Sequence, residues 1–287
     1  MSEFIVIIGT ESFIGNHILK NLIDYNFKEF DIKNDTISSL NLENVNTIIH
    51  LAAIVHQTKS ILNSEYFRVN SDLAFETAKE AKIQGVKHFV FFSTIKVYGD
   101  GGYDDLVYNE KSICKPTDSY GKSKLDAEKR INSLADEIFK VSIIRPSMVY
   151  GKGVKANMLL LSKLIQKLPL IPFGNIKNKR AMVSIDNLMI TLDAILNKKE
   201  TGVYLACDRK VVSTTQLVET LMKILERNKK LIKLPIFIQF LIKFIFPHQS
   251  RRLFGSFNVD ASATHSRLQI NEKLIDLETG LKKAFER

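Results

Sequence analysis

The sequence contains little cysteine: Cys114 and Cys207 are the only two among 287 residues. A small secreted domain held together by disulfides is therefore excluded, and neither cysteine has neighbours in a metal-ligand pattern. A secretory signal is also missing from the start of the sequence. We expect a protein of the reducing cytoplasm with no metal site.

Long apolar runs are missing too. Residues 234–246 are unusually apolar, but they fall short of the ~20 residues that a membrane-spanning helix needs. We expect a helix buried in a substrate-binding domain. The alternative is an amphipathic helix at the inner membrane surface, a peripheral contact that six nearby cations would support: Lys229, Lys230, Lys233, Lys243, Arg251 and Arg252.

Acidic residues are outnumbered, with 31 Asp and Glu against 41 Lys and Arg, which gives a formal net charge of +10. This balance favours anionic partners, among them phosphate-bearing small molecules. The lysines are spread along the chain, and neither an arginine-rich arm nor a nucleic-acid module is present, so we expect no nucleic-acid partner. The apolar fraction of 45% is sufficient for a packed core.

Short apolar segments alternate with helical patterns through the first half of the chain. Strands are predicted at residues 4–8, 47–51, 88–92 and 141–144, and helices at 15–25, 64–84 and 119–135. Such alternation is typical of an α/β fold with a doubly wound parallel sheet. Ligands bind beyond the carboxyl ends of such strands. The residues expected there are small or polar: Gly9, Ala52, Ala53, Ser93, Thr94, Arg145, Pro146 and Ser147.

Residues 9–15 follow the first predicted strand and contain Gly9, Ser12 and Gly15. In a dinucleotide-binding turn, the first glycine permits the turn and the last allows close packing of helix and strand. Ser12 occupies the place of the middle glycine, where its small side chain still admits a phosphate and its hydroxyl can donate to one. We expect cofactor contacts from these three residues and from Phe13 and Ile14. The alternative is an ordinary turn between strand and helix.

Tyr120 and Lys124 are four residues apart on a predicted helix, so both side chains leave the same face. A neighbouring cation stabilises a phenolate and lowers the pKa of a tyrosine from its usual value of about 10. The spacing therefore predicts a Tyr120 pKa below the ordinary value and a general acid or base.

Together these motifs resemble the extended short-chain dehydrogenases/reductases, in their NAD-dependent nucleotide-sugar epimerase/dehydratase branch. The resemblance covers nearly the whole chain. It rests on residues 9–15, 50–53, 93–99, 120–124, 149–151, 180–188 and 211–221, and on Asn70, Arg145, Pro146 and Asn157. The resemblance implies a Rossmann-type sheet in a dinucleotide-binding domain at residues 1–150, to which part of the later chain returns. It also implies a smaller, mainly substrate-binding domain at 151–287.

By this resemblance Tyr120 is the catalytic acid/base, and Lys124 lowers its pKa and hydrogen-bonds the nicotinamide ribose. Thr94 is the catalytic hydroxyl, which holds the sugar oxygen as it becomes a carbonyl. Ser93 contacts the cofactor and replaces Thr94 if the register is shifted by one. Asn70 is architectural. Four further residues of the strand ends are implied as cofactor contacts: Leu51, Ala52, Ala53 and Pro146.

The cofactor implied is NAD, with NADP as the alternative. Asp31 lies about twenty residues beyond the glycine loop, where a carboxylate binds the ribose 2′-hydroxyl of NAD. Asp35 is a second candidate, and Lys33 would instead favour a 2′-phosphate. The interval before the strand at 47–51 is short and contains one convincing strand, near residues 30–32, so one strand of the family is expected to be missing.

The substrate implied is a nucleotide sugar, held by Lys96, Asn157, Arg180 and Arg252, with Arg251 as the alternative to Arg252. Guanidinium groups suit a diphosphate because they stay charged and bind phosphate oxygens in pairs. Homodimers are common in the family, so the resemblance implies a homodimer, and it also implies a role in surface-polysaccharide biosynthesis.

The predicted activity is 4-epimerisation of a UDP-N-acetylhexosamine through a 4-keto sugar with bound NAD. The alternatives are an NAD(P)H-dependent 4-ketoreductase of a nucleotide 4-keto-6-deoxyhexosamine, an epimerase of a polyprenyl-diphosphate-linked sugar, and a non-catalytic NAD-binding sensor. A dehydratase is disfavoured, because Ile95 and Lys96 stand where that chemistry needs an acid/base pair.

Overall fold

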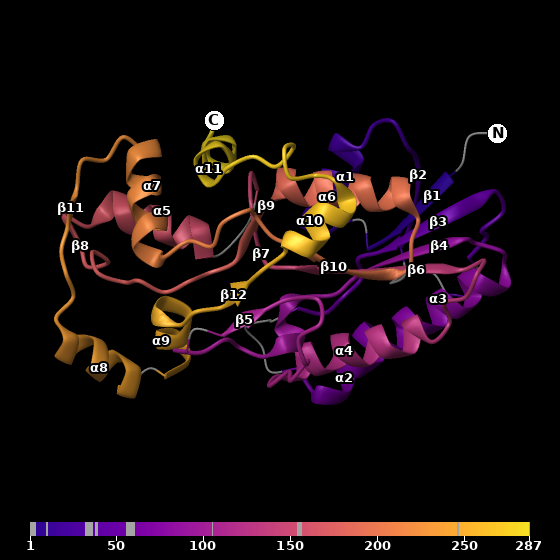
Figure 1. Ribbon diagram of the computed structural model, residues 1–287, viewed down its shortest axis with the longest axis horizontal. Helices are drawn as coiled ribbons and strands as arrows, with labels where there is room; N and C mark the ends of the chain where they lie inside the picture. The colour runs from indigo at the N-terminus through magenta and orange to yellow at the C-terminus, as the bar shows by residue number, and fades with distance from the viewer. Residues whose placement is uncertain are drawn as a thin grey trace.

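The computed structural model describes residues 4–9, 11–31, 37, 40–55, 61–104, 106–153, 157–245 and 247–286. Its centre is a parallel sheet, six-stranded over these residues, in the order β10-β6-β4-β3-β1-β2 (Figure 1). The strands are β1 (Phe4–Ile8), β2 (Asn26–Phe30), β3 (Val45–His50), β4 (His88–Phe92), β6 (Lys140–Pro146) and β10 (Gly202–Ala206). The predicted α/β fold with a doubly wound parallel sheet is confirmed.

Helices cover both faces of the sheet (Figure 1). On one face lie α1 (Phe13–Asn21), α6 (Ile185–Lys198) and α10 (Ser262–Leu268), whose buried side chains share a core with alternate residues of the strands. On the other face lie α3 (Leu73–Ile83) and α4 (Ser119–Asn132), which pack alanines closely against the sheet. The strands β1, β3, β4 and β6 are largely buried on both sides because the helices keep water from both faces, whereas the edge strand β2 is partly exposed.

The predicted boundaries hold best where the apolar runs are continuous. β1 and β4 have the predicted limits, whereas α1 begins two residues before the predicted start, because Ser12 caps it, and ends at Asn21. The predicted helix at residues 64–84 is three consecutive segments, α2 (Asn63–Phe67), the π-helical turn Arg68–Asp72 and α3. β2 ends at Phe30, the residue where the predicted strand starts, and within the described residues it is the one strand between α1 and β3.

The rest of the second half builds a smaller layer beyond the sheet (Figure 1). Its helices are α5 (Asn157–Lys167), α7 (Thr214–Ile224), α8 (Ile236–Ile245), α9 (Pro247–Phe254) and α11 (Leu277–Phe285). Three short parallel pairs join its segments: β7 (Met148–Tyr150) with β9 (Met182–Ser184), β8 (Leu170–Ile171) with β11 (Lys230–Leu231), and β5 (Val107–Tyr108) with β12 (Asn258–Val259). β10 returns from this half to pair with β6; the domain boundary near residue 150 stays a prediction.

The expectation that the apolar segment 234–246 is a buried helix is wrong. It forms α8 at the outer end of the molecule (Figure 1). Several of the large apolar side chains of α8 are more than half exposed. Apolar composition predicted burial, but α8 packs against α9 and leaves these side chains exposed. No helix within the described residues has both the length and the apolar character to cross a membrane.

Candidate active site

The carboxyl edge of the sheet gathers the residues predicted to bind the cofactor. Ile8 pairs with Phe30 on one side and with His50 on the other. The residues that follow these three paired positions, Gly9, Asp31 and Leu51, therefore lie along one edge. This is the edge at which ligands bind in open parallel sheets.

Gly9 permits a close approach of two backbone segments at this edge. Its φ is +92°, and a Cβ atom there would lie 2.7 Å from the backbone nitrogen of Ala52. The same segment is fixed because Leu51 N and Ala52 N both donate to Ile8 O, at 2.8 and 3.1 Å. The sequence thus needs glycine here for both conformation and space. Such a cradle fits a dinucleotide whose pyrophosphate lies against backbone.

Ser12 caps the helix that starts beside this cradle. Its hydroxyl accepts a hydrogen bond from Gly15 N at 3.0 Å, and Phe13 is the first residue of α1. The first N–H groups of a helix have no intrahelical acceptor, and the helix dipole is positive at this end. Ser12 therefore supports an anion site by ordering the turn, and its hydroxyl hydrogen is not consumed by the cap. Phe13 and Ile14 supply the adjacent backbone N–H groups.

Thr94, Tyr120 and Lys124 come together as the sequence predicted. Thr94 follows β4 and is 8% exposed, and its side chain shares a hydrogen bond with that of Tyr120. Tyr120 is the second residue of α4, which Asp118 caps by accepting from Gly121 N at 2.7 Å. Lys124 lies one turn further along the same helix face. The structure thus joins the hydroxyl and the phenol directly, with the ammonium on the next turn.

The predicted lowering of the Tyr120 pKa is wrong for this arrangement. Burial raises the pKa of Tyr120 to about 12, since desolvation of the phenolate outweighs the opposing effect of the hydrogen bond with Thr94. Lys124 Nζ donates to Phe92 O at 2.8 Å, and burial, not the Lys124 charge, dominates the pKa of Tyr120. Tyr120 is therefore a protonated hydrogen-bond donor at neutral pH.

Lys124 is itself strongly perturbed. Its side chain is 1% exposed, and its Nζ lies 4.5 Å from the centre of the Phe91 ring. Burial lowers the pKa of Lys124 to about 7, although the nearby Glu128 carboxylate opposes this shift. A lysine near half-protonation at neutral pH is uncommon outside functional sites. Lys124 can thus change its charge in response to a group placed beside it.

His50, which sequence reasoning did not single out as a functional residue, is buried at the end of β3. Its ring centre lies 5.9 Å from that of Phe91, and neither ring nitrogen has a hydrogen-bond partner among the described residues. Burial, with a smaller contribution from the Lys124 charge, lowers the pKa of His50 to about 3. His50 is therefore neutral, and it adds no charge beneath Lys124.

Ser93 and Arg145 do not face the Thr94 hydroxyl. Ser93 donates to Glu128 on α4, and Arg145 binds the same carboxylate through Nε at 2.9 Å and Nη2 at 2.5 Å. Arg145 also donates to the Tyr98 hydroxyl at 2.7 Å. This buried network joins β4, β6 and α4, and Pro146 ends β6 in the same buried layer. Ser93 as the replacement for Thr94 is not supported, because its hydroxyl is engaged elsewhere.

Lys96, predicted to contact substrate, forms ion pairs with Asp118 and, at 3.0 Å, with Asp100. Because Asp118 caps α4, Lys96 helps to fix the start of the helix that carries Tyr120.

Asn70 has the predicted architectural role. It accepts from Ile54 N at 2.7 Å, and its amide donates to Ile54 O and to the Ser123 hydroxyl.

The residues that would choose between NAD and NADP are partly described. Asp31 is exposed directly after β2, at the same edge as Gly9. This is the place expected for a carboxylate that binds the ribose of the cofactor. Lys33 and Asp35 lie outside the described residues. The described positions therefore favour the 2′-hydroxyl of NAD.

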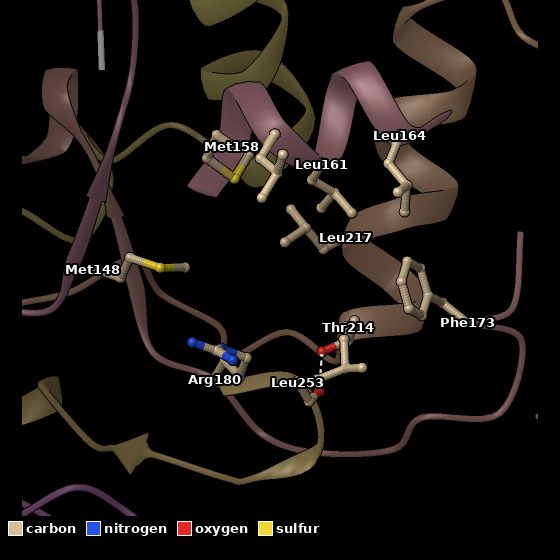
Figure 2. A pocket seen from close by; sticks show the side chains of 10 residues that line it. Met148, Met158, Leu161, Leu164, Phe173, Arg180, Thr214, Leu217 and Leu253 are labelled. Carbon is tan, nitrogen blue, oxygen red and sulfur yellow. Dashed lines mark hydrogen bonds between the residues drawn. The ribbon is translucent and has the colours of Figure 1, made fainter. Parts of the chain in front are cut away.

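A cavity of about 260 Å³ lies in the smaller layer (Figure 2). Figure 2 shows apolar side chains of α5 and α7 facing the Arg180 guanidinium across it. Asn157 is the first residue of α5, and Arg252 belongs to α9; their side chains lie outside the described residues. The lining residues are Met148, Met158, Leu160, Leu161, Leu164, Phe173, Arg180, Thr214, Leu217 and Leu253.

Arg180 is fixed through its backbone, which exchanges hydrogen bonds with Val212 at 2.9 and 3.0 Å. Asn178, buried nearby, accepts from Thr214 N and donates to Leu253 O, so it joins α7 to α9 at the base of the cavity. Of the lining residues, sequence reasoning found Arg180 alone. The apolar periodicity of α5 and α7 was a usable signal, but it does not tell a cavity wall from a core.

The chain matches the NAD dependent epimerase/dehydratase family over residues 5–206. It is 33% identical to the UDP-glucose 4-epimerase of Vibrio cholerae, with 93% of this chain and 90% of that relative covered. It is 25% identical to the N-acetyl-α-D-glucosaminyl-diphospho-ditrans,octacis-undecaprenol 4-epimerase of Escherichia coli O157:H7, over 80% of this chain and 74% of the relative.

Among solved structures, the UDP-N-acetylglucosamine 4-epimerase of Bacillus cereus has a TM-score of 0.76 at 18% identity, covering 99% of this chain and 98% of its own. At that identity the likeness concerns the fold, which is therefore of the Rossmann type. The family match covers more than half of the chain and names NAD, the cofactor that the resemblance implied. The chain therefore belongs to the NAD dependent epimerase/dehydratase family and is an enzyme of the extended short-chain dehydrogenase/reductase type.

Proposed function

We propose that this protein is a nucleotide-sugar 4-epimerase with bound NAD, and that its substrate is a UDP-N-acetylhexosamine. The observation that carries the proposal is the hydrogen bond between Thr94 and Tyr120 at the carboxyl edge of the sheet, one helical turn from the buried Lys124. A Vibrio cholerae relative at 33% identity is a UDP-glucose 4-epimerase, which supports chemistry at C4.

The cofactor would lie across the carboxyl edge. Gly9 and the first turn of α1 would hold its pyrophosphate, Asp31 its adenosine ribose, and Lys124 its nicotinamide ribose, with Leu51, Ala52, Ala53 and Pro146 as apolar walls. Bound NAD supplies the capacity to accept a hydride from the sugar and to return it. The residues of the chain supply the remaining chemistry.

Tyr120 and Thr94 would act on the sugar 4-hydroxyl. Thr94 holds the 4-oxygen, and Tyr120 moves the proton between that oxygen and its own. A phenol with a pKa of about 12 is a poor base, so binding must lower the pKa. Conversion of Lys124 to its charged form beside bound groups would do so, since its own pKa of about 7 allows that change at neutral pH.

The sugar must turn over between the two hydride transfers, while its carrier stays bound. Arg180 would hold the diphosphate of that carrier, and Asn157 and Arg252 would assist it. The N-acetylhexosamine assignment rests on the resemblance of residues 93–97 and 180–188 to a subgroup that acts on such sugars. The same subgroup includes 4-ketoreductases of 4-keto-6-deoxyhexosamines.

A second candidate, a polyprenyl-diphosphate-linked hexosamine, is favoured by one observation. The cavity beside Arg180 is lined almost wholly by leucine, methionine and phenylalanine, which suits an isoprenoid better than a uracil ring. The Escherichia coli O157:H7 relative acts on an undecaprenyl-linked sugar.

The test is to incubate the purified protein with NAD and, separately, UDP-N-acetylglucosamine and its polyprenyl-diphosphate counterpart, and to follow the sugar by NMR. We expect the C4 epimer to form from the nucleotide sugar. Epimer formation from the lipid-linked sugar alone would move the assignment to the second candidate. Reduction of a 4-keto sugar without any epimerisation would identify a ketoreductase, and cofactor binding without turnover of any sugar would identify a sensor.

A further inference from the structure

The outer face of α8 is an exposed apolar surface. Its five large apolar side chains are between 51% and 79% exposed, and they occupy positions i, i+3, i+4, i+7 and i+8, so they share one side of the helix. We call these residues the α8 surface: Phe237, Phe240, Leu241, Phe244 and Ile245. Contiguous apolar surface of this kind marks an interaction site.

The charge around this surface has one sign. Residues 227–259 contain Lys and Arg at seven positions and neither Asp nor Glu. Among the seven, the described residues with exposed side chains are Arg227, Lys230, Lys233 and Arg251. A protein partner that carries both signs of charge would not require a segment without acidic residues. Phenylalanines flanked by cations are the pattern of helices that lie in the plane of an anionic membrane.

Hydrogen bonds connect the segment before α8 to the wall of the cavity. Leu234, two residues before α8, exchanges hydrogen bonds with the Asn175 side chain at 3.1 and 3.2 Å. Asn175 lies two residues after Phe173, which lines the cavity. On its other side α8 packs against α9, whose Leu253 also lines the cavity. α8 and α9 are neighbours at the end of the molecule that lies furthest from the sheet (Figure 1).

We propose that the α8 surface docks this protein on the surface of an anionic lipid bilayer. The phenylalanines enter the boundary between head groups and acyl chains, and Arg227, Lys230 and Lys233 bind lipid head groups around them. The proposal does not depend on the sugar: docking would bring the cavity beside the membrane whether the substrate is lipid-linked or soluble.

The experiment is co-sedimentation of the full chain with sucrose-loaded vesicles, without any sugar substrate. One vesicle preparation is phosphatidylglycerol with phosphatidylethanolamine, and the other is phosphatidylcholine alone. We expect at least ~10-fold stronger binding to the anionic vesicles. Added salt should weaken this binding, because it screens the attraction between Arg227, Lys230 and Lys233 and the lipid head groups. Failure to bind anionic vesicles overturns the proposal.

Two sets of variants locate the contact. Phe237→Ser/Phe240→Ser/Phe244→Ser should reduce vesicle binding by at least ~10-fold, and Lys230→Gln/Lys233→Gln by several-fold. The matched control, Ile23→Ser/Ile83→Ser/Ile138→Ser, removes three equally exposed apolar side chains elsewhere and should bind as wild type. Wild-type binding by the triple phenylalanine variant would overturn the proposal.

Light scattering of the same proteins without vesicles examines the other occupant, a second copy of this chain. A dimer that the phenylalanine substitutions convert to monomer would assign the surface to self-association and overturn docking on lipid. An unchanged oligomeric state, together with lost vesicle binding, supports the proposal. Unaltered thermal unfolding of the variants ensures that the loss is not a loss of fold.

Discussion

The carboxyl edge of the sheet and the cavity beside Arg180 hold their polar groups in different ways. At the edge, Thr94, Tyr120 and Lys124 are fixed by a strand end, a capped helix and a backbone carbonyl. In the cavity, a single guanidinium faces apolar walls supplied by three helices. Under the proposed function, the sheet positions the groups that act on the sugar, and the shape and polarity of the smaller layer select the carrier.

The largest expected effect is on turnover, when the Tyr120 hydroxyl is removed. Tyr120→Phe keeps the ring but lacks the group that moves the proton, so turnover should fall by about 10³-fold, in the range expected for a lost general acid/base. Cofactor binding, followed by fluorescence, should be retained. Tyr103→Phe, which alters a half-exposed tyrosine, is the control and should leave turnover unchanged.

The second largest effect concerns the buried ion pair between Glu128 and Arg145, beside the carboxyl edge of the sheet. Glu128→Gln leaves Arg145 buried without its carboxylate, so the free energy of unfolding should fall by about 3 kcal/mol. Urea denaturation measures this change. Glu137→Gln, on the surface, should have no effect on stability. An unchanged free energy of unfolding in Glu128→Gln would show that the network does not hold the edge together.

Lys124 provides a test by pH. Its pKa is about 7 in the folded protein and about 10.5 when unfolded, so between these values the unfolded state binds more protons and stability rises with pH. From pH 7 to pH 9 the gain should be about 2 kcal/mol for wild type relative to Lys124→Met. Urea unfolding of the nucleotide-free proteins at both pH values measures it. Parallel pH dependences in the two proteins would mean that Lys124 titrates normally.

The smallest expected effect belongs to the cavity. Arg180→Ala should raise the KM for the nucleotide sugar about 10-fold and change kcat little, because a charge-assisted hydrogen bond to a diphosphate acts in the ground state and the transition state alike. Lys177→Ala removes an exposed cation three residues away and should leave KM as it is. Steady-state kinetics would contradict the assignment if both variants behaved alike.

Sequence patterns were sufficient for the parallel sheet, the glycine turn and the Tyr120–Lys124 pair, because each depends on local spacing and on strand ends meeting at one edge. The role of Thr94 was assigned by the family resemblance. The direction of the Tyr120 pKa shift was not predictable from the spacing, since burial of the phenol is its largest cause. The Glu128–Arg145 pair joins a helix to a strand, and no local pattern reveals such a contact. The exposure of α8 was missed because apolar composition does not say whether a neighbour exists to cover it.

The central claim is that Thr94, Tyr120 and Lys124 epimerise a nucleotide sugar at C4 by removing a hydride and returning it. UDP-N-acetylglucosamine labelled with deuterium at C4, incubated with the protein and NAD, tests this claim most directly. NMR should show the C4 epimer with its deuterium still at C4, and none should form with Tyr120→Phe. An epimer that has lost its C4 deuterium, or one that Tyr120→Phe forms as fast as wild type, would contradict the claim.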